Sequence, residues 1–324
     1  MEIVFQRKET FKLVNAGTSY WNHRITLAKD KENIARLFKA VDHPGDLFLC
    51  QWAQLMSMTL EFEPDLVLEL GRGRGNSTCA FTEAIHLINS GNRQVVSLCL
   101  SDDWDKLTKP RVSQVVPSSW FSPLQTLQTD ILSFDYQLLL SEKRKILIFW
   151  DAHGFEVAEC VLGRILPLVA AKPHWVIMHD LSDTRSTEGN RFYGENGLWK
   201  GNNWSGPRLR IGNIDSAVEQ AIAAIDFTTR NKLNLFSADE AIREEIGNDP
   251  QKLSEIRRIL GDDMFSMAAH WFYFSLNERE GTFTFPKPGP VNKALIGAKN
   301  PVPAEQASLL GKVKNKIRSV LKPW

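Results

Sequence analysis

Two pairs of acidic and imidazole side chains are the residues of this 324-residue sequence best suited to acid–base or metal chemistry. Asp151 and His153 follow the apolar run KILIFW, and His179 and Asp180 follow the run WVIM. If both runs are neighbouring parallel strands, their carboxyl ends meet at one edge of a sheet and the four side chains converge. Such a set can hold a divalent cation such as Mg²⁺, or remove a proton from a hydroxyl group. In the alternative interpretation Asp151 only contacts a cofactor and the histidines bond to backbone.

A glycine-rich segment earlier in the chain has the pattern of a nucleotide-like cofactor site. Residues 65–81 read DLVLELGRGRGNSTCAF, an apolar run that ends on an acid and continues into three glycines at alternate positions and a polar helix start. Glycine lets the backbone approach a ligand closely, and a helix N-terminus offers N–H groups. A tight turn without a ligand is the alternative. The candidate cofactor contacts are Glu69, Gly71, Arg72, Gly73, Gly75, Asn76 and Ser77 around the glycines, and Asp102, Asp130 and Asp151 after later strands.

The elements that must position these residues alternate between short apolar strands and helical patterns. This alternation is typical of a parallel sheet with crossover helices. The expected strands are 65–69, 94–100, 124–127, 145–150 and 175–178. The expected helices are 78–89, 156–170, 215–225, 239–246 and 250–260. Two late apolar runs, 270–276 and 282–285, predict an antiparallel hairpin, and residues 1–64 predict a helical cap with helices at 30–41 and 46–62.

The order Glu69-x-Gly-x-Gly-x-Gly resembles the first motif of the class I S-adenosylmethionine-dependent methyltransferases, and the expected strand order resembles theirs over residues 65–285. The D-x-H and later H-D pattern resembles a branch related to cephalosporin hydroxylase-like, macrolide-sugar and rhamnosyl O-methyltransferases. This resemblance implies an α/β, Rossmann-like sheet with helices on both faces, S-adenosyl-L-methionine as cofactor, and methylation of a hydroxyl on a small molecule or glycan intermediate. An inactive S-adenosylmethionine-binding partner protein is one alternative. An NAD-dependent oxidoreductase is less favoured, because its loop would read G-x-G-x-x-G.

The resemblance also implies roles for the strand-end residues. Asp151 and Asp180 match the metal ligands, and His153, His179 or Asp180 would act on the proton of the acceptor. The acid that binds the ribose would fall near Cys99, which cannot take that part, so Asp102 or Asp103 would replace it. Asp130 matches the acid near the adenine amino group.

Residues 183–215 combine glycines and asparagines with aromatic side chains, a composition too polar for a core and too aromatic for a plain linker. We expect a lid loop over the active site, with an Ω-loop packed on the protein's own surface as the alternative. Its candidate acceptor contacts are Tyr193, Trp199 and Trp204.

Composition and charge narrow the kinds of partner, cysteine site and cellular location that the sequence allows. The 39 basic and 38 acidic residues nearly cancel, which disfavours nucleic acid as a partner, and the four cysteines form no C-x-x-C pair. No signal-peptide pattern and no run of about 18 apolar residues occurs, so we expect a cytoplasmic protein without a transmembrane segment. The proline-rich tail, 286–324, ends in a basic amphipathic pattern at 308–322. This pattern is compatible with a weak membrane-surface or protein contact, or with a helix docked on its own domain. A homo-oligomer is compatible with the sequence.

Overall fold

The computed structural model describes residues 2–5, 14–88, 91–179, 191–192, 210–211 and 215–287. All of them belong to one compact unit, Met1–Gly289. Asp180, the aromatic residues Tyr193, Trp199 and Trp204, most of the expected lid loop and the tail from residue 288 lie outside the described residues. The division into cap, lid and tail therefore stays a prediction.

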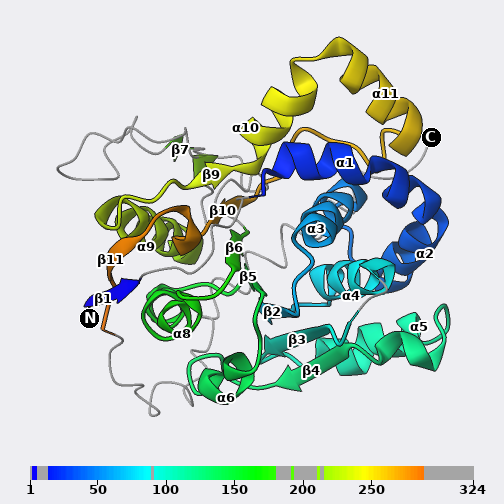
Figure 1. The fold of residues 1–324 in the computed structure, drawn as a ribbon. Helices are drawn as coiled ribbons and strands as arrows, with labels where there is room; N and C mark the ends of the chain where they lie inside the picture. The colour runs from blue at the N-terminus through cyan, green and yellow to red at the C-terminus, as the bar shows by residue number, and fades with distance from the viewer. Residues whose placement is uncertain are drawn as a thin grey trace, which may run out of the picture. The chain divides into compact units, whose positions relative to one another are not determined.

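A seven-stranded sheet organises the described residues (Figure 1). The first five strands in its order are parallel to one another, whereas β10 is antiparallel to both of its neighbours. The order is β4 (Leu124–Gln128), β3 (Gln94–Cys99), β2 (Leu66–Leu70), β5 (Ile146–Trp150), β6 (His174–Met178), β10 (Phe272–Phe274) and β9 (Phe236–Ser237). Within this sheet the chain passes first through β2, the central one of the five parallel strands, then outward through β3 to β4, and then crosses to β5 on the other side of β2. The fold is the mostly parallel, Rossmann-like α/β sheet that the sequence predicted.

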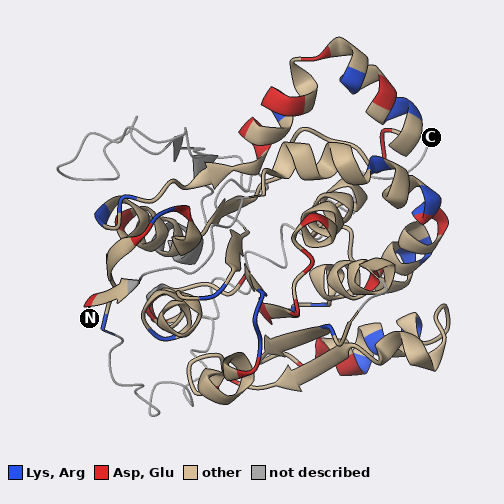
Figure 2. Ribbon diagram, in the orientation of Figure 1, with Lys and Arg blue, Asp and Glu red and all other residues tan. Residues whose placement is uncertain are grey.

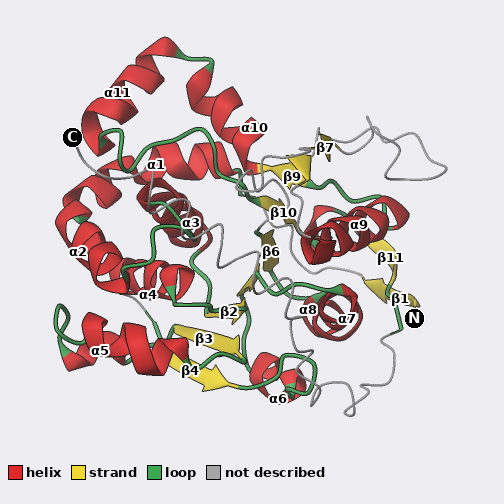
Figure 3. Cartoon of the chain, turned by 180° about the vertical axis from the view of Figure 1, so that it is seen from behind, coloured by secondary structure: helices red, strands yellow, loops and turns green. Residues whose placement is uncertain are grey.

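Helices cover both faces of this sheet (Figure 3). Alternate residues of a strand point to opposite faces, so Val67 packs into one hydrophobic core while Leu66 and Leu68 pack into the other. The first face carries α1 (Ala16–Lys29), α2 (Lys31–Val41), α3 (Leu49–Phe62) and α4 (Asn76–Ile88). The second carries α6 (Tyr136–Ser141), α7 (Phe155–Cys160), η3 (Val161–Ile165), α8 (Leu166–Val169) and α9 (Asp215–Arg230).

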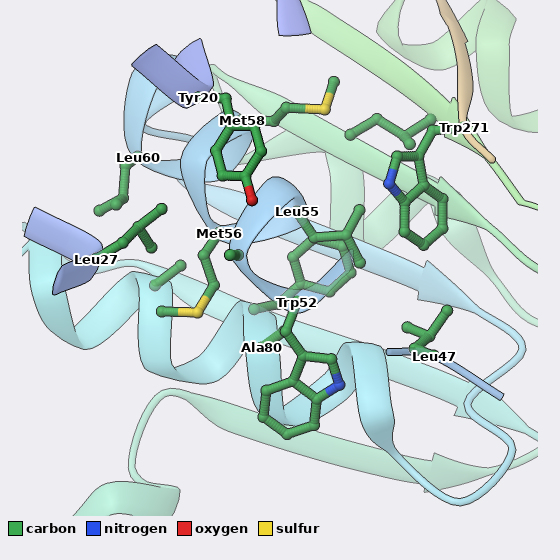
Figure 4. Close-up of a cluster of buried hydrophobic side chains, with 14 of the residues drawn as sticks. Tyr20, Leu27, Leu47, Trp52, Leu55, Met56, Met58, Leu60, Ala80 and Trp271 are labelled. Atoms are coloured by element: carbon green, nitrogen blue, oxygen red, sulfur yellow. The ribbon is translucent and has the colours of Figure 1, made fainter. Parts of the chain in front are cut away.

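Helix α3 lies inside the first core instead of on its surface. Nearly every residue from Gln51 to Phe62 is buried, which is the pattern of a helix surrounded by other elements. Figure 4 shows the buried side chains Tyr20, Leu27, Trp52, Leu55, Met56, Ala80 and Trp271 in one cluster. None of the helices in the described residues combines the length and apolar character needed to span a bilayer.

The late strands pair differently from the expected hairpin. Strand β10 is buried along its whole length and joins the main sheet between β6 and β9, because an all-apolar strand suits the interior. Strand β11 (Gly281–Thr284) instead pairs with β1 (Glu2–Phe5) in a separate antiparallel sheet. In β11 the side chains of Thr282 and Thr284 are exposed, whereas Phe283 between them is buried. This alternation is typical of a sheet with one face exposed to solvent. The predicted pairing of 270–276 with 282–285 was therefore wrong, and β1 is a strand within the segment expected to be helical.

The remaining elements surround the sheet. They are η1 (Trp104–Thr108), α5 (Lys109–Val112), η2 (Ser118–Phe121), α10 (Ala238–Ile242), η4 (Arg243–Gly247), α11 (Pro250–Leu260) and η5 (Leu276–Glu278). Two short strands, β7 (Arg191–Phe192) and β8 (Arg210–Ile211), form a separate antiparallel pair.

Candidate functional site

The glycine loop, residues 71–75, joins the central strand β2 to helix α4. Gly71, Gly73 and Gly75 have φ values of +93°, +50° and +91°, where side chains are disfavoured. A Cβ on Gly71 would lie 2.7 Å from the carbonyl oxygen of Asp151, and one on Gly75 would lie 2.4 Å from Cε3 of Trp104. Around Gly73 nothing lies within 4 Å of such a Cβ. The loop is thus pressed between β5 and η1, and the position of Gly73 is the open one where a ligand can approach the backbone.

Glu69 faces helix α4 and is fully buried. Its Oε1 accepts a hydrogen bond from Ser77 Oγ at 2.5 Å, and its Oε2 accepts one from Thr78 Oγ1 at 2.6 Å. Burial raises the pKa of the Glu69 carboxyl, while the hydroxyl donors and the charge of Arg72 act to lower it. Glu69 and Ser77 therefore fix the loop to the first turn of α4, a role that does not require direct contact with a cofactor.

Arg72 turns into the protein and is only 1 % exposed. Its Nη1 donates to the carbonyl oxygen of Ser97 at 2.8 Å and to Ser97 Oγ at 3.2 Å. Within the described part of the chain its Nε and Nη2 have no hydrogen-bond partner. The guanidinium thus anchors the loop to β3 beside Glu69.

Asn76 anchors the other end of the loop. Its Nδ2 donates to the carbonyl oxygen of His43 at 3.0 Å and to Asp46 Oδ2 at 3.1 Å. Its Oδ1 accepts from Trp52 Nε1 at 3.3 Å. The start of α4 is therefore tied to the segment that enters α3.

Asp151 and His179 meet at the carboxyl ends of β5 and β6, as the sequence predicted. Asp151 Oδ1 and His179 Nδ1 are 2.9 Å apart. The imidazole is 2 % exposed and packs against the rings of Trp271, at 4.6 Å between centroids, and Phe149, at 6.5 Å. In the neutral form, an imidazole that donates from Nδ1 to a carboxylate carries its basic lone pair on Nε2. The pair can therefore take up a proton, provided that a substrate reaches it.

His153 lies on the same strand end but bonds in another direction. Its Nδ1 is 3.0 Å from Oε1 of the buried Gln220 on α9, and Gln220 Nε2 donates to the carbonyl oxygen of Trp150 at 3.4 Å. Asp180, the fourth residue of the predicted set, lies outside the described residues. Among the residues that are described, no group of three His, Cys, Asp or Glu side chains is placed to hold a metal. These residues alone do not fit a metal centre.

The acids expected at the ribose and adenine lie after β3 and β4. Strand β3 ends at Cys99, so Asp102 stands three residues beyond it and forms an ion pair with Lys106. Asp130 Oδ1 accepts from the backbone N–H of Leu132 at 2.9 Å, which closes a turn. Both acids are at the expected edge of the sheet, and their roles toward a cofactor stay predictions.

Three residues of the site had no clear signal in the sequence. Trp104 packs on Gly75, Trp271 packs on His179, and Gln220 contacts His153. Each comes from a segment remote in sequence from its partner, so no local spacing pointed to it.

Comparison with known proteins gives likeness of fold only. No protein-family model and no curated protein sequence matches the chain. It is similar to a cofactor-bound structure of Rv0187 from MTB, with 14 % identity, coverage of 69 % of this chain and 90 % of that chain, and a TM-score of 0.43. It is also similar to the O-methyltransferase TomG from Streptomyces achromogenes in complex with SAM, with 12 % identity, coverage of 62 % and 81 %, and a TM-score of 0.41.

An O-methyltransferase from Bacillus cereus in complex with SAH is a third, with 15 % identity, coverage of 68 % and 79 %, and a TM-score of 0.35. At these identities and TM-scores, the likeness says nothing about the activity of this chain. The strand order of this chain itself shows a Rossmann-like, mostly parallel sheet, with the glycine loop after β2, the central one of the five parallel strands.

Proposed function

We propose that this protein is an S-adenosylmethionine-dependent methyltransferase that acts on a hydroxyl group of a small molecule or glycan intermediate. The observation that carries the proposal is the glycine loop, which follows the central strand at the point where the strand order reverses. In open α/β sheets, ligands bind beyond the carboxyl ends of the strands at such a point. Three positive φ values and the open position at Gly73 give a ligand access to the backbone.

The donor would lie along the loop backbone and the N-terminus of α4. Glu69, Arg72 and Asn76 hold this backbone through buried hydrogen bonds, so the site is organised before a ligand arrives. Asp102 and Asp130 are the proposed partners of the ribose and the adenine.

The proposed reaction is an in-line displacement. The acceptor oxygen forms a bond to the methyl carbon, the bond from this carbon to sulfur breaks, and the sulfonium becomes a neutral thioether. The acceptor also loses its hydroxyl proton, and the protein gains most by aligning the three reacting atoms. We assign the proton to His179, with Asp151 fixing the tautomer and stabilising the imidazolium. His153 is the alternative base.

A divalent cation is a separate part of the proposal. Asp151 and Asp180 would be its ligands, and the cation would make the acceptor hydroxyl more acidic. Since only Asp151 of this pair is among the described residues, no step of the reaction is assigned to the metal.

Calorimetry with S-adenosylhomocysteine tests the donor site. We expect the wild-type protein to bind it, and Gly73→Val to weaken binding at least tenfold, because the added side chain fills the open position over the loop. Gly91→Val is the matched control, since Gly91 also has a positive φ, +76°, with open space around it, and lies outside the loop. Binding of NAD in place of S-adenosylhomocysteine would overturn the proposal in favour of an oxidoreductase. Donor binding without methyl transfer to any acceptor in a labelled-donor screen would favour the inactive binding protein.

A further inference from the structure

A second hollow of the molecule is not used by the proposed methyl transfer. A cavity of about 470 Å³ lies between α10 and η4 on one side, α11 on another and the segment 261–270 that leads into β10. This volume is within the range of small-molecule sites. Its residues are different from those of the glycine loop and of the Asp151–His179 pair.

Charges of both signs line this cavity without pairing with one another. Arg243 and Arg257 contribute two guanidinium groups, and Asp239 and Asp262 contribute two carboxylates. In the described part of the structure none of the four forms an ion pair. Figure 2 shows acidic residues on α10 and both acidic and basic residues on α11. A purely anionic ligand would meet the two carboxylates, and a purely cationic ligand would meet the two guanidinium groups, whereas a ligand with both charges can pair with each sign.

The wall between these charges is apolar and held in place. Phe265 is 5 % exposed and packs on the ring of Tyr20. Met267 Sδ lies 2.7 Å from the place that a Cβ on Gly247 would occupy, so the segment sits tightly on η4. These side chains give a ligand an apolar surface beside the charged groups.

Backbone hydrogen bonds fix the same wall. Asp239 Oδ1 accepts from the N–H groups of Ala269 and His270, the latter at 3.0 Å, and Gln54 Nε2 donates to the carbonyl oxygen of Ser266 at 2.9 Å. These hydrogen bonds within the protein hold the wall of the cavity in place, which lowers the entropy cost of binding.

Strand register places the cavity at the ligand-binding edge of the sheet. Phe272 pairs with Met178 of β6 and with Ser237 of β9, so the residues just before β10 and just after β9 lie at the carboxyl end of β6. The Ala238 N–H donates to the carbonyl oxygen of Trp271 at 3.0 Å, and Trp271 packs on His179. The cavity residue His270 is thus followed directly by Trp271, which packs on His179, and the cavity and the candidate active site share no residue.

We propose that this cavity binds a small zwitterion, a molecule with a carboxylate, an ammonium group and an apolar side chain, of the amino-acid class. The carboxylate pairs with Arg243 and Arg257, the ammonium group pairs with Asp262 and Asp239, and the side chain lies on Phe265 and Met267. The site does not depend on the proposed methyl transfer.

Calorimetry with the full chain and three matched probes tests this assignment. L-Phenylalanine carries both charges, 3-phenylpropanoate carries only the negative charge, and phenethylamine carries only the positive charge. We expect L-phenylalanine to bind up to about fivefold more tightly than either single-charge probe, since Arg243, Arg257 and Asp262 are exposed and ion pairs in solvent contribute about that factor. L-Leucine, with 4-methylpentanoate and isoamylamine, repeats the comparison for an aliphatic side chain.

Single substitutions in and beside the cavity test whether the zwitterion binds there. Arg257→Gln should weaken binding of the zwitterion by up to about fivefold, and Asp262→Asn should weaken it without changing the affinity for 3-phenylpropanoate. Arg258→Gln is the control, because it removes the same charge from an exposed neighbour on α11 outside the cavity. Equal affinities for the zwitterion and the single-charge probes, no binding of either amino acid at about 1 mM, or equal effects of the Arg257 and Arg258 variants would overturn the proposal. S-Adenosylhomocysteine affinity, measured on the same proteins, reports separately on the proposed function.

Discussion

Alanine substitutions at two positions of the glycine loop should have different effects. Gly75→Ala should mainly reduce the free energy of unfolding, and Gly73→Ala should mainly weaken donor binding. At Gly75 an added Cβ meets Trp104, a buried ring that cannot turn away, at a φ of +91°. The positive φ costs about 1–2 kcal/mol, and overpacking a well-packed core costs a further ~1–3 kcal/mol. Gly75→Ala should therefore reduce the free energy of unfolding by about 2–5 kcal/mol. At Gly73 the φ of +50° is in the left-handed region but the space is open, so only about 1–2 kcal/mol is lost.

Thermal unfolding and calorimetry on the two variants measure this difference. The melting temperature should fall by roughly 4–10 °C for Gly75→Ala and by about 2–4 °C for Gly73→Ala. S-Adenosylhomocysteine affinity should fall for Gly73→Ala, because the added methyl group occupies the open position. Replacing Trp104 with Leu should cost less stability in the Gly75→Ala background than in the wild type, since the two positions are in contact.

Equal melting temperatures for the two variants would refute this reasoning. So would a double variant whose stability is the sum of the two single effects, because the contact between Gly75 and Trp104 would then carry no energy.

Three further predictions concern the site. Asp151→Asn keeps the shape of the side chain but removes its charge. Turnover measured with labelled donor should fall by a factor of about 10²–10⁴, while the affinity for S-adenosylhomocysteine stays within about twofold. Unchanged turnover would show that Asp151 does not assist His179 in taking the proton. The pKa of Glu69 is raised above its ordinary 4.5, so the folded state binds the proton more tightly and stability is lost as the pH rises from 4.5 through the raised value. Glu69→Gln should therefore gain melting temperature relative to the wild type between pH 5 and pH 8, and a difference independent of pH would contradict this. Treatment with EDTA should leave S-adenosylhomocysteine affinity within about twofold, because the glycine loop presents backbone groups to the donor; loss of turnover restored by Mg²⁺ would support Asp151 and Asp180 as metal ligands.

The main sheet was predictable because burial on both faces leaves a plain pattern in the sequence. Parallel strands such as β5 and β6 read as short continuous apolar runs, and each ends on the polar residues that reach the site. The same rule placed Asp151 and His179 together, since the order of the strands made their ends neighbours. The pairing of β11 could not be read in this way, because its partner β1 lies at the other end of the chain.

Side-chain direction was less predictable than position. The spacing of Glu69 before the glycines is compatible with a contact to a cofactor and with a contact to the next helix. The structure shows the contact to the helix, because the hydroxyls of Ser77 and Thr78 stand in the first turn of α4 and each donates to one carboxylate oxygen, and the contact to a cofactor stays a prediction. Hydroxyl residues eight and nine positions after a strand-end acid were therefore the signal in the sequence for this arrangement.

The orientation of His179 depends on packing from a distant part of the fold. Trp271, which stacks on its imidazole, is fully buried and donates from Nε1 to Oε1 of Gln54 on α3 at 3.1 Å. Gln54 is itself buried in the first core. An imidazole that bonds to Asp151 and packs against a ring fixed in this way has little freedom to turn, which is the condition for accepting a proton from a well-defined direction. The helix α3, which the sequence alone presented as a cap, therefore acts on the candidate active site through Trp271.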